Sequence, residues 1–282
     1  MAQEIESGPA TASVQSLQIE PPEILLQGSN RQQQIVVTAQ GTDGKLFDVT
    51  RAARLVSRDS AVTRVNESSV IGIADGTTEL LVRVGSVQAM VPVRVTGFGR
   101  FPPVHFGNDV VPVLSKLGCN SGGCHGKASG QNGFKLSVFG FDPAADYDAI
   151  VKEARGRRVF PASPERSLIL LKPMAQVPHG GGRRMEPGSR EHELLLEWLK
   201  QGMPVGESAA PRAVAIRVSP AERVMRFQAE QQILATVDFS DGSRRDVSHA
   251  AAYTSNSDAI AEVGGNGLIR TGQVPGEASV TV

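Results

Sequence analysis

The stretch Gln34-Ile-Val-Val-Thr-Ala39 decides the fold, because together with its turn it occurs twice in the chain. Such β-branched runs leading into Asp-Gly turns are typical of β-hairpins. The match keeps one register, with an offset of 198 residues, from the Asp-Gly turn through Val84 and its partner Val282. A gapless match of this length indicates duplication, so the sequence predicts two copies of one all-β sandwich. The first copy reads Gln34-Ile-Val-Val-Thr-Ala39, Asp43-Gly44, Asp48-Val49-Thr50, and the second reads Ile233-Leu-Ala-Thr-Val-Asp238, Asp241-Gly242, Asp246-Val247-Ser248.

Each copy has an opening proline, a strand, an Asp-Gly turn, an Asp-Val-Thr/Ser motif and a closing strand after a Gly-rich turn. This pattern resembles the bacterial Ig-like domains of group 2, over roughly residues 16–96 and 212–282. The first copy continues past Val84 with a further strand-like run, whereas the second stops at Val282. We therefore expect the second sandwich to be C-terminally incomplete, and the protein to continue into further domains or to be completed by another chain.

Composition limits the classes of function. The 282 residues carry 29 Lys or Arg and 29 Asp or Glu, so the formal net charge is zero and no nucleic-acid partner is expected. No run approaches the ~18 apolar residues of a membrane-spanning helix. The start Met1-Ala-Gln-Glu-Ile-Glu6 lacks the basic and apolar regions of a signal peptide, which is compatible with a mature chain whose signal has been removed.

Between the copies the hydrophobic pattern changes to helical periodicity. Capping residues and apolar stripes predict helices over 108–117, 163–172 and 189–201, the last ending at Gly202. The predicted fold class is therefore two all-β Ig-like sandwiches flanking a small, mainly α-helical domain. The predicted domains are 16–97, 98–208 and 212–282.

Cys119-Asn-Ser-Gly-Gly-Cys124-His125 is the segment most informative about chemistry. Covalent attachment of haem c needs two thiols on one side of the porphyrin and an imidazole directly after the second thiol as iron ligand. The usual spacing is Cys-x-x-Cys-His, and this chain departs from it with four intervening residues. Gly122 and Gly123 make the longer loop compatible with attachment.

Three other interpretations of the two cysteines stay open. They could form a short-loop disulfide, with His125 coincidental, or bind zinc together with His105 or His179. A redox dithiol would usually have two intervening residues in a thioredoxin-like context, which is missing from this sequence. The basic runs at 155–158 and 183–184 are expected to be solvated surface, with contact to haem propionates as the alternative.

Three further runs accompany the Cys motif, and the pattern resembles a class I cytochrome c domain, more narrowly the planctomycete-type cytochrome c domains found with Ig-like modules. The resemblance spans about 110 residues and implies one covalently bound haem c, with its iron, and electron transfer. The runs are Gly133-Phe-Lys-Leu-Ser-Val-Phe-Gly140, Pro178-His-Gly-Gly-Gly-Arg183 and Trp198-Leu-Lys-Gln-Gly202.

The second axial ligand of the iron is predicted to be His179, which precedes a glycine run at the place of a distal loop. Met185 is the alternative, because thioether ligation is common in cytochromes c. Met174 and an open sixth position are further alternatives, and each methionine could equally fill the core.

The sequence thus predicts a monohaem c-type cytochrome module for electron transfer, periplasmic or otherwise extracytoplasmic, with an unidentified redox partner. The Ig-like domains would act as spacers or docking modules. Two alternatives remain: a peroxidase-like haem enzyme or the cytochrome subunit of a larger secreted enzyme, and a non-haem structural or adhesion protein with a disulfide.

Overall fold

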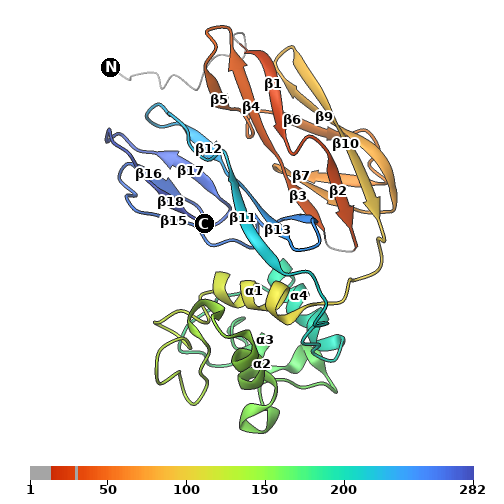
Figure 1. Cartoon of the computed structure of the whole chain (residues 1–282), viewed down its shortest axis with the longest axis vertical. Helices are drawn as coiled ribbons and strands as arrows, with labels where there is room; N and C mark the ends of the chain where they lie inside the picture. The colour runs from red at the N-terminus through yellow and green to blue at the C-terminus, as the bar shows by residue number, and fades with distance from the viewer. Residues whose placement is uncertain (1–13, 29–30) are drawn as a thin grey trace. The chain divides into compact units, whose positions relative to one another are not determined.

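The computed structural model describes residues 14–28 and 31–282, so the start Met1–Glu6 lies outside the described part. The chain divides into two compact units. The β unit contains both sequence copies except Phe239–Asp241, and the second unit, the insert, comprises Phe101–Ala213 together with those three residues (Figure 1). Both ends of the insert's main segment thus continue into the same β unit.

Copy 1 consists of ten short strands in three sheets, ordered β1-β4-β5, β2-β10-β9-β6 and β3-β8-β7. Its core is aliphatic, with Ile35, Val82 and Val93 almost fully buried. The long β10 runs antiparallel to β9 and parallel to β2. The strands are β1 (Val14–Glu20), β2 (Ile24–Gln27), β3 (Gln32–Gln34), β4 (Val36–Gly41), β5 (Leu46–Asp48), β6 (Arg54–Ser57), β7 (Thr63–Asn66), β8 (Ser69–Gly72), β9 (Gly76–Val84) and β10 (Val87–Thr96).

Copy 2 repeats this arrangement in sheets ordered β11-β13-β14, β12-β17-β16 and β15-β18, and its β15, β16 and β18 are shorter than their counterparts β6, β7 and β9. The hydrogen bond from the Val37 amide to Thr50 Oγ1 returns as that from the Ala235 amide to Ser248 Oγ. The same backbone-to-hydroxyl hydrogen bond thus recurs at matching positions of the two copies. The strands are β11 (Ala213–Ser219), β12 (Glu230–Gln232), β13 (Leu234–Phe239), β14 (Arg244–Asp246), β15 (Thr254–Ser255), β16 (Ala261–Val263), β17 (Leu268–Thr271) and β18 (Val280–Thr281).

The insert contains four α-helices of four to eleven residues and several single turns. Helix α4 begins at the predicted cap, where Ser189 Oγ accepts the amide of His192, and Gly202 follows its last turn. The elements are η2 (Phe106–Val110), α1 (Val111–Lys116), η3 (Val138–Gly140), α2 (Pro143–Val151), η4 (Glu153–Gly156), η5 (Pro164–Arg166), α3 (Leu168–Leu171) and α4 (Arg190–Lys200).

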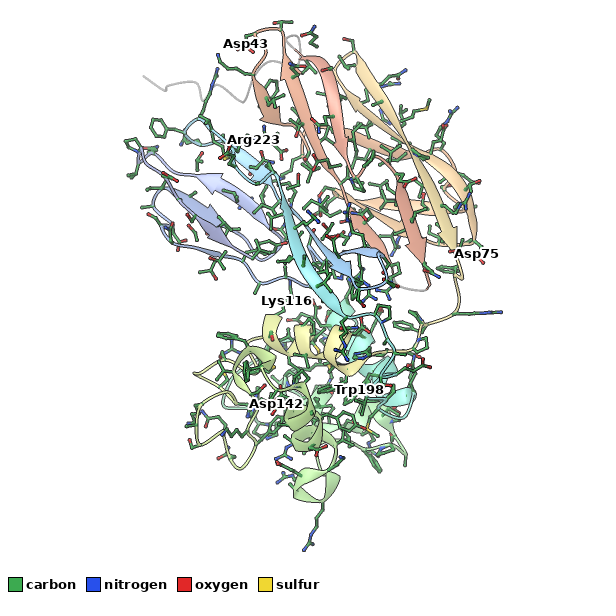
Figure 2. The ribbon with its side chains drawn as sticks, in the orientation of Figure 1. Asp43, Asp75, Lys116, Asp142, Trp198 and Arg223 are labelled. Atoms are coloured by element: carbon green, nitrogen blue, oxygen red, sulfur yellow. The ribbon has the colours of Figure 1, made fainter. Side chains whose placement is uncertain are left out.

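The core of the insert is built around the chain's single tryptophan, Trp198, which is fully buried (Figure 2). Phe106 packs against Trp198 at 5.5 Å between ring centroids and against Tyr147 at 5.3 Å. The indole Nε1 donates a 2.9 Å hydrogen bond to the carbonyl of Pro204, which satisfies the only polar atom of this side chain.

The predicted fold class is wrong. Strands dominate the described chain, and each copy is divided among three small sheets. The insert consists mainly of turns and loops, and its longest helix, α4, has 11 residues. The apolar periodicity does form helices over 106–116 and 190–200. The segment predicted as a helix over 163–172, however, breaks into η5 and the one-turn α3, because Ser167 adopts an extended backbone between them.

None of the described helices is long and apolar enough to cross a membrane.

Candidate functional site

The loop from Cys119 to His125 is closed by its own backbone. The amide of His125 donates to the carbonyl of Cys119 at 3.0 Å, and the Gly126 amide donates to Ser121 O at 3.0 Å. A Cβ at Gly126 would lie 2.1 Å from the carbonyl oxygen of Asn120, so the closure requires glycine there. Gly122 and Gly123, in contrast, have neither a positive φ nor a close neighbour. Gly126, and not the predicted Gly122 and Gly123, is therefore the glycine that the closed loop requires.

The two thiols are free, and Cys119 is the more constrained. Its side chain packs against the hydrophobic core of the insert, and its amide is bonded to Leu114 O at 2.8 Å. Burial raises the pKa of Cys119 to about 11, with a further contribution from the neighbouring Cys124 and an opposing one from Arg184. Because the thiolate is the reactive form, Cys119 is a poor nucleophile at neutral pH.

His125 lies against an aromatic and cationic stack. Its Nδ1 is 3.0 Å from the carbonyl oxygen of Phe134, and the two rings lie 4.4 Å apart. The Arg158 guanidinium lies over the Phe134 ring, 4.3 Å from its centroid. Burial lowers the pKa of His125, and the nearby His179 and Arg158 lower it further, so the imidazole is neutral at pH 7.

Arg158 is a structural residue and not the solvated basic face predicted for the run at 155–158. It is only 8% exposed. Its guanidinium donates to the carbonyls of Ala149 at 2.6 Å and Gly133 at 2.8 Å. It therefore ties helix α2 to the loop that carries Phe134.

The predicted axial ligands differ in their surroundings. His179 is half-buried, with Nδ1 at 2.8 Å from Gly182 O, and lies near enough to influence the pKa of His125. Met185 and Met174 are both buried in the core of the insert, at 3% and 4% exposure. The structure thus brings Cys119, Cys124, His125 and His179 into one region, and places the methionines as core residues.

This region does not have the features of a metal centre. Within residues 14–28 and 31–282, no three His, Cys, Asp or Glu side chains are grouped to hold a metal ion, which leaves the zinc interpretation without its ligands. Haem c would need both thiols and the imidazole on one open face. Here the partly buried Cys119 packs against the core, and the Phe134 ring lies 4.4 Å from the His125 ring. Haem attachment itself stays a prediction.

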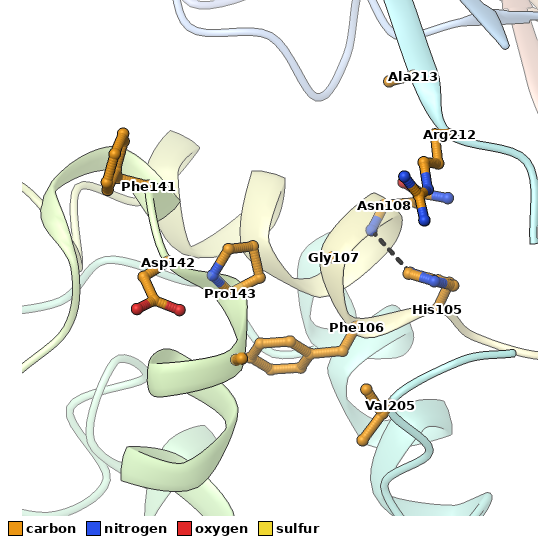
Figure 3. A pocket seen from close by; sticks show the side chains of 11 residues that line it. His105, Phe106, Gly107, Asn108, Phe141, Asp142, Pro143, Val205, Arg212 and Ala213 are labelled. Atoms are coloured by element: carbon orange, nitrogen blue, oxygen red, sulfur yellow. Dashed lines mark hydrogen bonds between the residues drawn. The ribbon is translucent and has the colours of Figure 1, made fainter. Parts of the chain in front are cut away.

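A pocket of about 540 Å³ lies elsewhere in the insert (Figure 3). Its walls include Phe106, Phe141, Pro143 and Val205, with His105 at one side. His105 Nδ1 accepts the Asn108 amide at 3.2 Å and so is occupied as the cap of the turn η2. Neither cysteine lines this pocket, so it offers no support for a thiol-linked cofactor.

Sequence reasoning missed a reciprocal contact between the two copies. Asp48 Oδ2 accepts the backbone amide of Gln232 at 2.8 Å, and Asp246 Oδ2 accepts that of Gln34 at 2.5 Å. Each carboxylate also accepts the amide two residues onward in its own chain segment, at 2.6 Å from Thr50 and 2.8 Å from Ser248. The repeated Asp-Val-Thr/Ser motif could have indicated this contact, because it places a carboxylate acceptor, Asp48 or Asp246, at the same position of each copy.

Further polar contacts surround this pair of bonds. Arg51 of copy 1 forms a 2.9 Å ion pair with Glu230 of copy 2, and Ser219 donates to the Glu20 carboxylate. Gln231 Nε2 adds a second donor to Asp48 Oδ2 at 2.8 Å. Burial raises the pKa of Asp48, while the bonds from Gln232 and Thr50 oppose that shift. The two copies are thus joined by paired, partly buried hydrogen bonds.

Comparisons with known proteins return no function. No family model matches the chain, and no curated protein matches it. Among solved structures, domains 4–9 of the S-layer protein SbsC align at 9% identity and a TM-score of 0.31, covering 95% of this chain and 29% of that one. Domains 4 and 5 of the same protein align at 18% identity and a TM-score of 0.26, covering 29% of this chain and 51% of that one. The alignments therefore cover between 29% and 51% of these two SbsC structures.

The interpretation as a cytochrome is corrected by the side chains that the structure brings together. Within residues 14–28 and 31–282, no group of three His, Cys, Asp or Glu side chains is arranged to hold a metal ion. The resemblance to class I and planctomycete-type cytochrome c domains between group 2 Ig-like domains, and the electron-transfer or haem-enzyme function drawn from it, are therefore wrong. The physical reason is that Cys-x4-Cys-His is a local pattern, which does not by itself show how the two thiols and the imidazole pack in the folded insert.

Proposed function

We propose that this chain is a structural protein in which the two β copies form one rigid frame that carries the insert. The observation that carries the proposal is the reciprocal pair of bonds from Asp48 to Gln232 and from Asp246 to Gln34. Hydrogen bonds to charged acceptors are the stronger class, and each contributes about 1.5–3 kcal/mol. A single bond would let one copy rotate relative to the other, whereas two bonds at separate positions restrict that rotation.

The connectivity supports the same role. Both ends of Phe101–Ala213 continue into the β unit, so both ends of the insert are covalently joined to the frame. Arg51 and Glu230 add an exposed ion pair, which is worth less than the carboxylate–amide bonds. In this role the frame carries the insert.

Distance measurement by double electron–electron resonance tests whether the two β copies form a rigid frame. Spin labels at Asp43→Cys and Asp258→Cys, in a Cys119→Ser, Cys124→Ser background, report the separation of exposed positions in the two copies. A narrow distance distribution is expected, and the Asp48→Ala, Asp246→Ala double variant should broaden it. A broad distribution in the parent protein would show two independently moving copies, which is incompatible with a frame.

A disulfide in the insert accompanies this proposal, since secreted structural proteins use such bridges. Oxidation would join Cys119 Sγ to Cys124 Sγ, releasing two protons and passing two electrons to an oxidant such as glutathione disulfide. The closed backbone of the loop and the electrostatic coupling of the two thiols support it. Intact mass after expression in an oxidising compartment should fall by the mass of two hydrogens, whereas a gain by one haem would contradict the proposal.

A further inference from the structure

The four-stranded sheet of copy 1, ordered β2-β10-β9-β6, packs one face on the core and leaves the other open (Figure 1). Side chains alternate along each strand, so every second residue belongs to the open side, which we call the outer face. Several of these residues are large and apolar. Leu25 is 66% exposed, Met90 55% and Val56 37%.

Three of the apolar residues lie side by side across the sheet. Val56 of β6 pairs with Leu81 of β9, and Leu81 pairs with Met90 of β10. Pro92 follows two residues after Met90 on the same side. Directly opposed residues have Cβ atoms about 4.5–5.5 Å apart, so these side chains form one continuous apolar strip. Exposed strips of this kind with a polar border are typical of interaction sites.

The charge on the outer face has one sign, although residues 14–97 carry eight Lys or Arg and eight Asp or Glu. Among the described residues, the outer face presents one acid, Glu79, and four cations, Arg54, Arg58, Arg83 and Arg94. Arg58 forms a 2.9 Å ion pair with Glu79, which leaves three arginines in excess. Its Nη1 also lies 3.7 Å from the Met90 sulfur, so the cations border the apolar strip.

The three excess arginines have no carboxylate partner in the part of the chain that the structure describes. Arg54 and Arg83 lie directly opposite each other in β6 and β9. Arg83 donates a 3.3 Å hydrogen bond to the neutral side chain of Gln88. Like charges at opposed positions destabilise a sheet, so this pair has a cost in folding that the carboxylate of a partner would remove.

Copy 2 shows that the sandwich can form without such a surface. Its β15 pairs with β18 as β6 pairs with β9, and the cross-strand pair Val56–Leu81 returns as Thr254–Thr281. The offset between β9 and β18 is 200, because the turns between 263 and 276 contain two more residues than their counterparts in copy 1. Small polar residues therefore stand where copy 1 has the apolar strip.

The ion pair of the outer face is also missing from these positions of copy 2. The amide of Asn256 donates to Ser279 O, as the amide of Arg58 donates to Glu79 O. An amide and a hydroxyl side chain thus replace the arginine and the glutamate. Since the backbone bonding is the same, the apolar and cationic side chains of copy 1 are not explained by the needs of the fold.

We propose that the outer face of copy 1 binds an acidic protein. Its Asp or Glu side chains pair with Arg54, Arg83 and Arg94, around an apolar contact on Leu81 and Met90. Arg and Met are enriched in protein–protein interfaces, whereas Lys, Asp and Glu are depleted, and every cation of the outer face is arginine. A guanidinium also binds a carboxylate through two parallel hydrogen bonds. A polyanion such as nucleic acid would use the charge and leave the apolar strip without a role.

Selection of random peptides on the full wild-type chain, with depletion on the Val56→Thr, Leu81→Thr variant, supplies the probe. This variant carries the residues of copy 2 and should keep the wild-type circular dichroism spectrum. The selected peptides should be rich in Asp or Glu beside apolar residues. In fluorescence anisotropy, a labelled selected peptide should bind Arg54→Gln, Arg83→Gln at least tenfold more weakly than the wild type. Arg64→Gln, at an exposed position of β7 in another sheet, is the control and should change binding less than twofold.

Four results would overturn the inference. Selected peptides without Asp or Glu, or an equal effect of the Arg64 and Arg54–Arg83 substitutions, would show that the arginines do not recognise the peptide. Heparin binding that depends on Arg54 and Arg83 but not on Val56 and Leu81 would assign the face to a polyanion. Sedimentation of the wild type as a dimer that Val56→Thr, Leu81→Thr dissociates would assign it to a second copy of this chain. A selection that enriches no peptide would also contradict the proposal.

Discussion

The carboxylate of Asp48 and the backbone amide of Gln232, 184 residues apart in the chain, form a 2.8 Å hydrogen bond between the two β copies. Replacing Asp48 by Ala leaves a partly buried amide without its acceptor, which costs about 1–3 kcal/mol. We therefore expect Asp48→Ala to lower the free energy of unfolding of the β unit by that amount, measured by denaturant titration followed by circular dichroism. Asp258→Ala, at an exposed position of copy 2, is the control and should stay within about 0.5 kcal/mol.

The pH dependence of stability should carry the signature of Asp48. Burial raises its pKa in the folded protein above the ordinary value of 3.8. The folded state therefore binds this proton more tightly than the unfolded state, and the contribution is complete below pH 3.8 and lost as pH rises through the folded pKa. The unfolding free energy of the wild type minus that of Asp48→Asn should decrease from pH 3 to pH 7. A difference that increases over this range would show that the carboxylate is favoured by folding.

Arg158 should be essential to the stability of the insert. Arg158→Ala removes the hydrogen bonds to the carbonyl of Ala149 in helix α2 and to that of Gly133 in the loop, together with the contact over Phe134, and we expect a loss of about 2–4 kcal/mol. Trp198 is the only tryptophan and lies in the core of the insert, so its fluorescence during denaturation reports this unit selectively. The exposed neighbour Arg157→Ala serves as control, and equal effects of the two substitutions would rule out the structural role of Arg158.

Cys119 should resist alkylation in the reduced, folded protein. Its pKa of about 11 leaves on the order of one thiolate in a thousand at pH 8, and its side chain packs on the core. Iodoacetamide at pH 8 should therefore modify Cys119 only at the rate at which the insert opens, as followed by peptide mass mapping. Rapid labelling that matches the rate in denaturant would place the thiol in solvent.

The parts of the fold that the sequence predicted correctly depend on neighbouring residues. Ser189 and Gly202 bracket helix α4, and the Asp-Gly turns at 43–44 and 241–242 join β4 to β5 and β13 to β14. Each signal is contained within a few residues, so packing elsewhere does not alter it. The duplication was visible for the same reason, since it needs only comparison of the chain with itself.

The errors arose where the outcome depends on tertiary contacts. Whether Cys119 faces solvent is set by its packing on the core of the insert, and whether His125 is open is set by Phe134, nine residues away. The Cys-x4-Cys-His spacing indicates neither the packing of Cys119 nor the aromatic neighbour of His125. Asp48 was noted as part of a repeated motif, but its partner Gln232 belongs to the other copy, and no local pattern connects them.

Amide hydrogen exchange at Gln34 and Gln232, resolved by nuclear magnetic resonance, tests the central claim most directly. Each amide donates to a carboxylate of the other copy, so a rigid frame requires both to exchange only through opening of the joined copies. We expect both amides to be protected in the wild type, and Asp48→Ala to deprotect Gln232 more strongly than Gln34. Exchange of both amides in the wild type at the rate of the exposed turn at Asp43 would contradict the account, because the two copies would then not be joined.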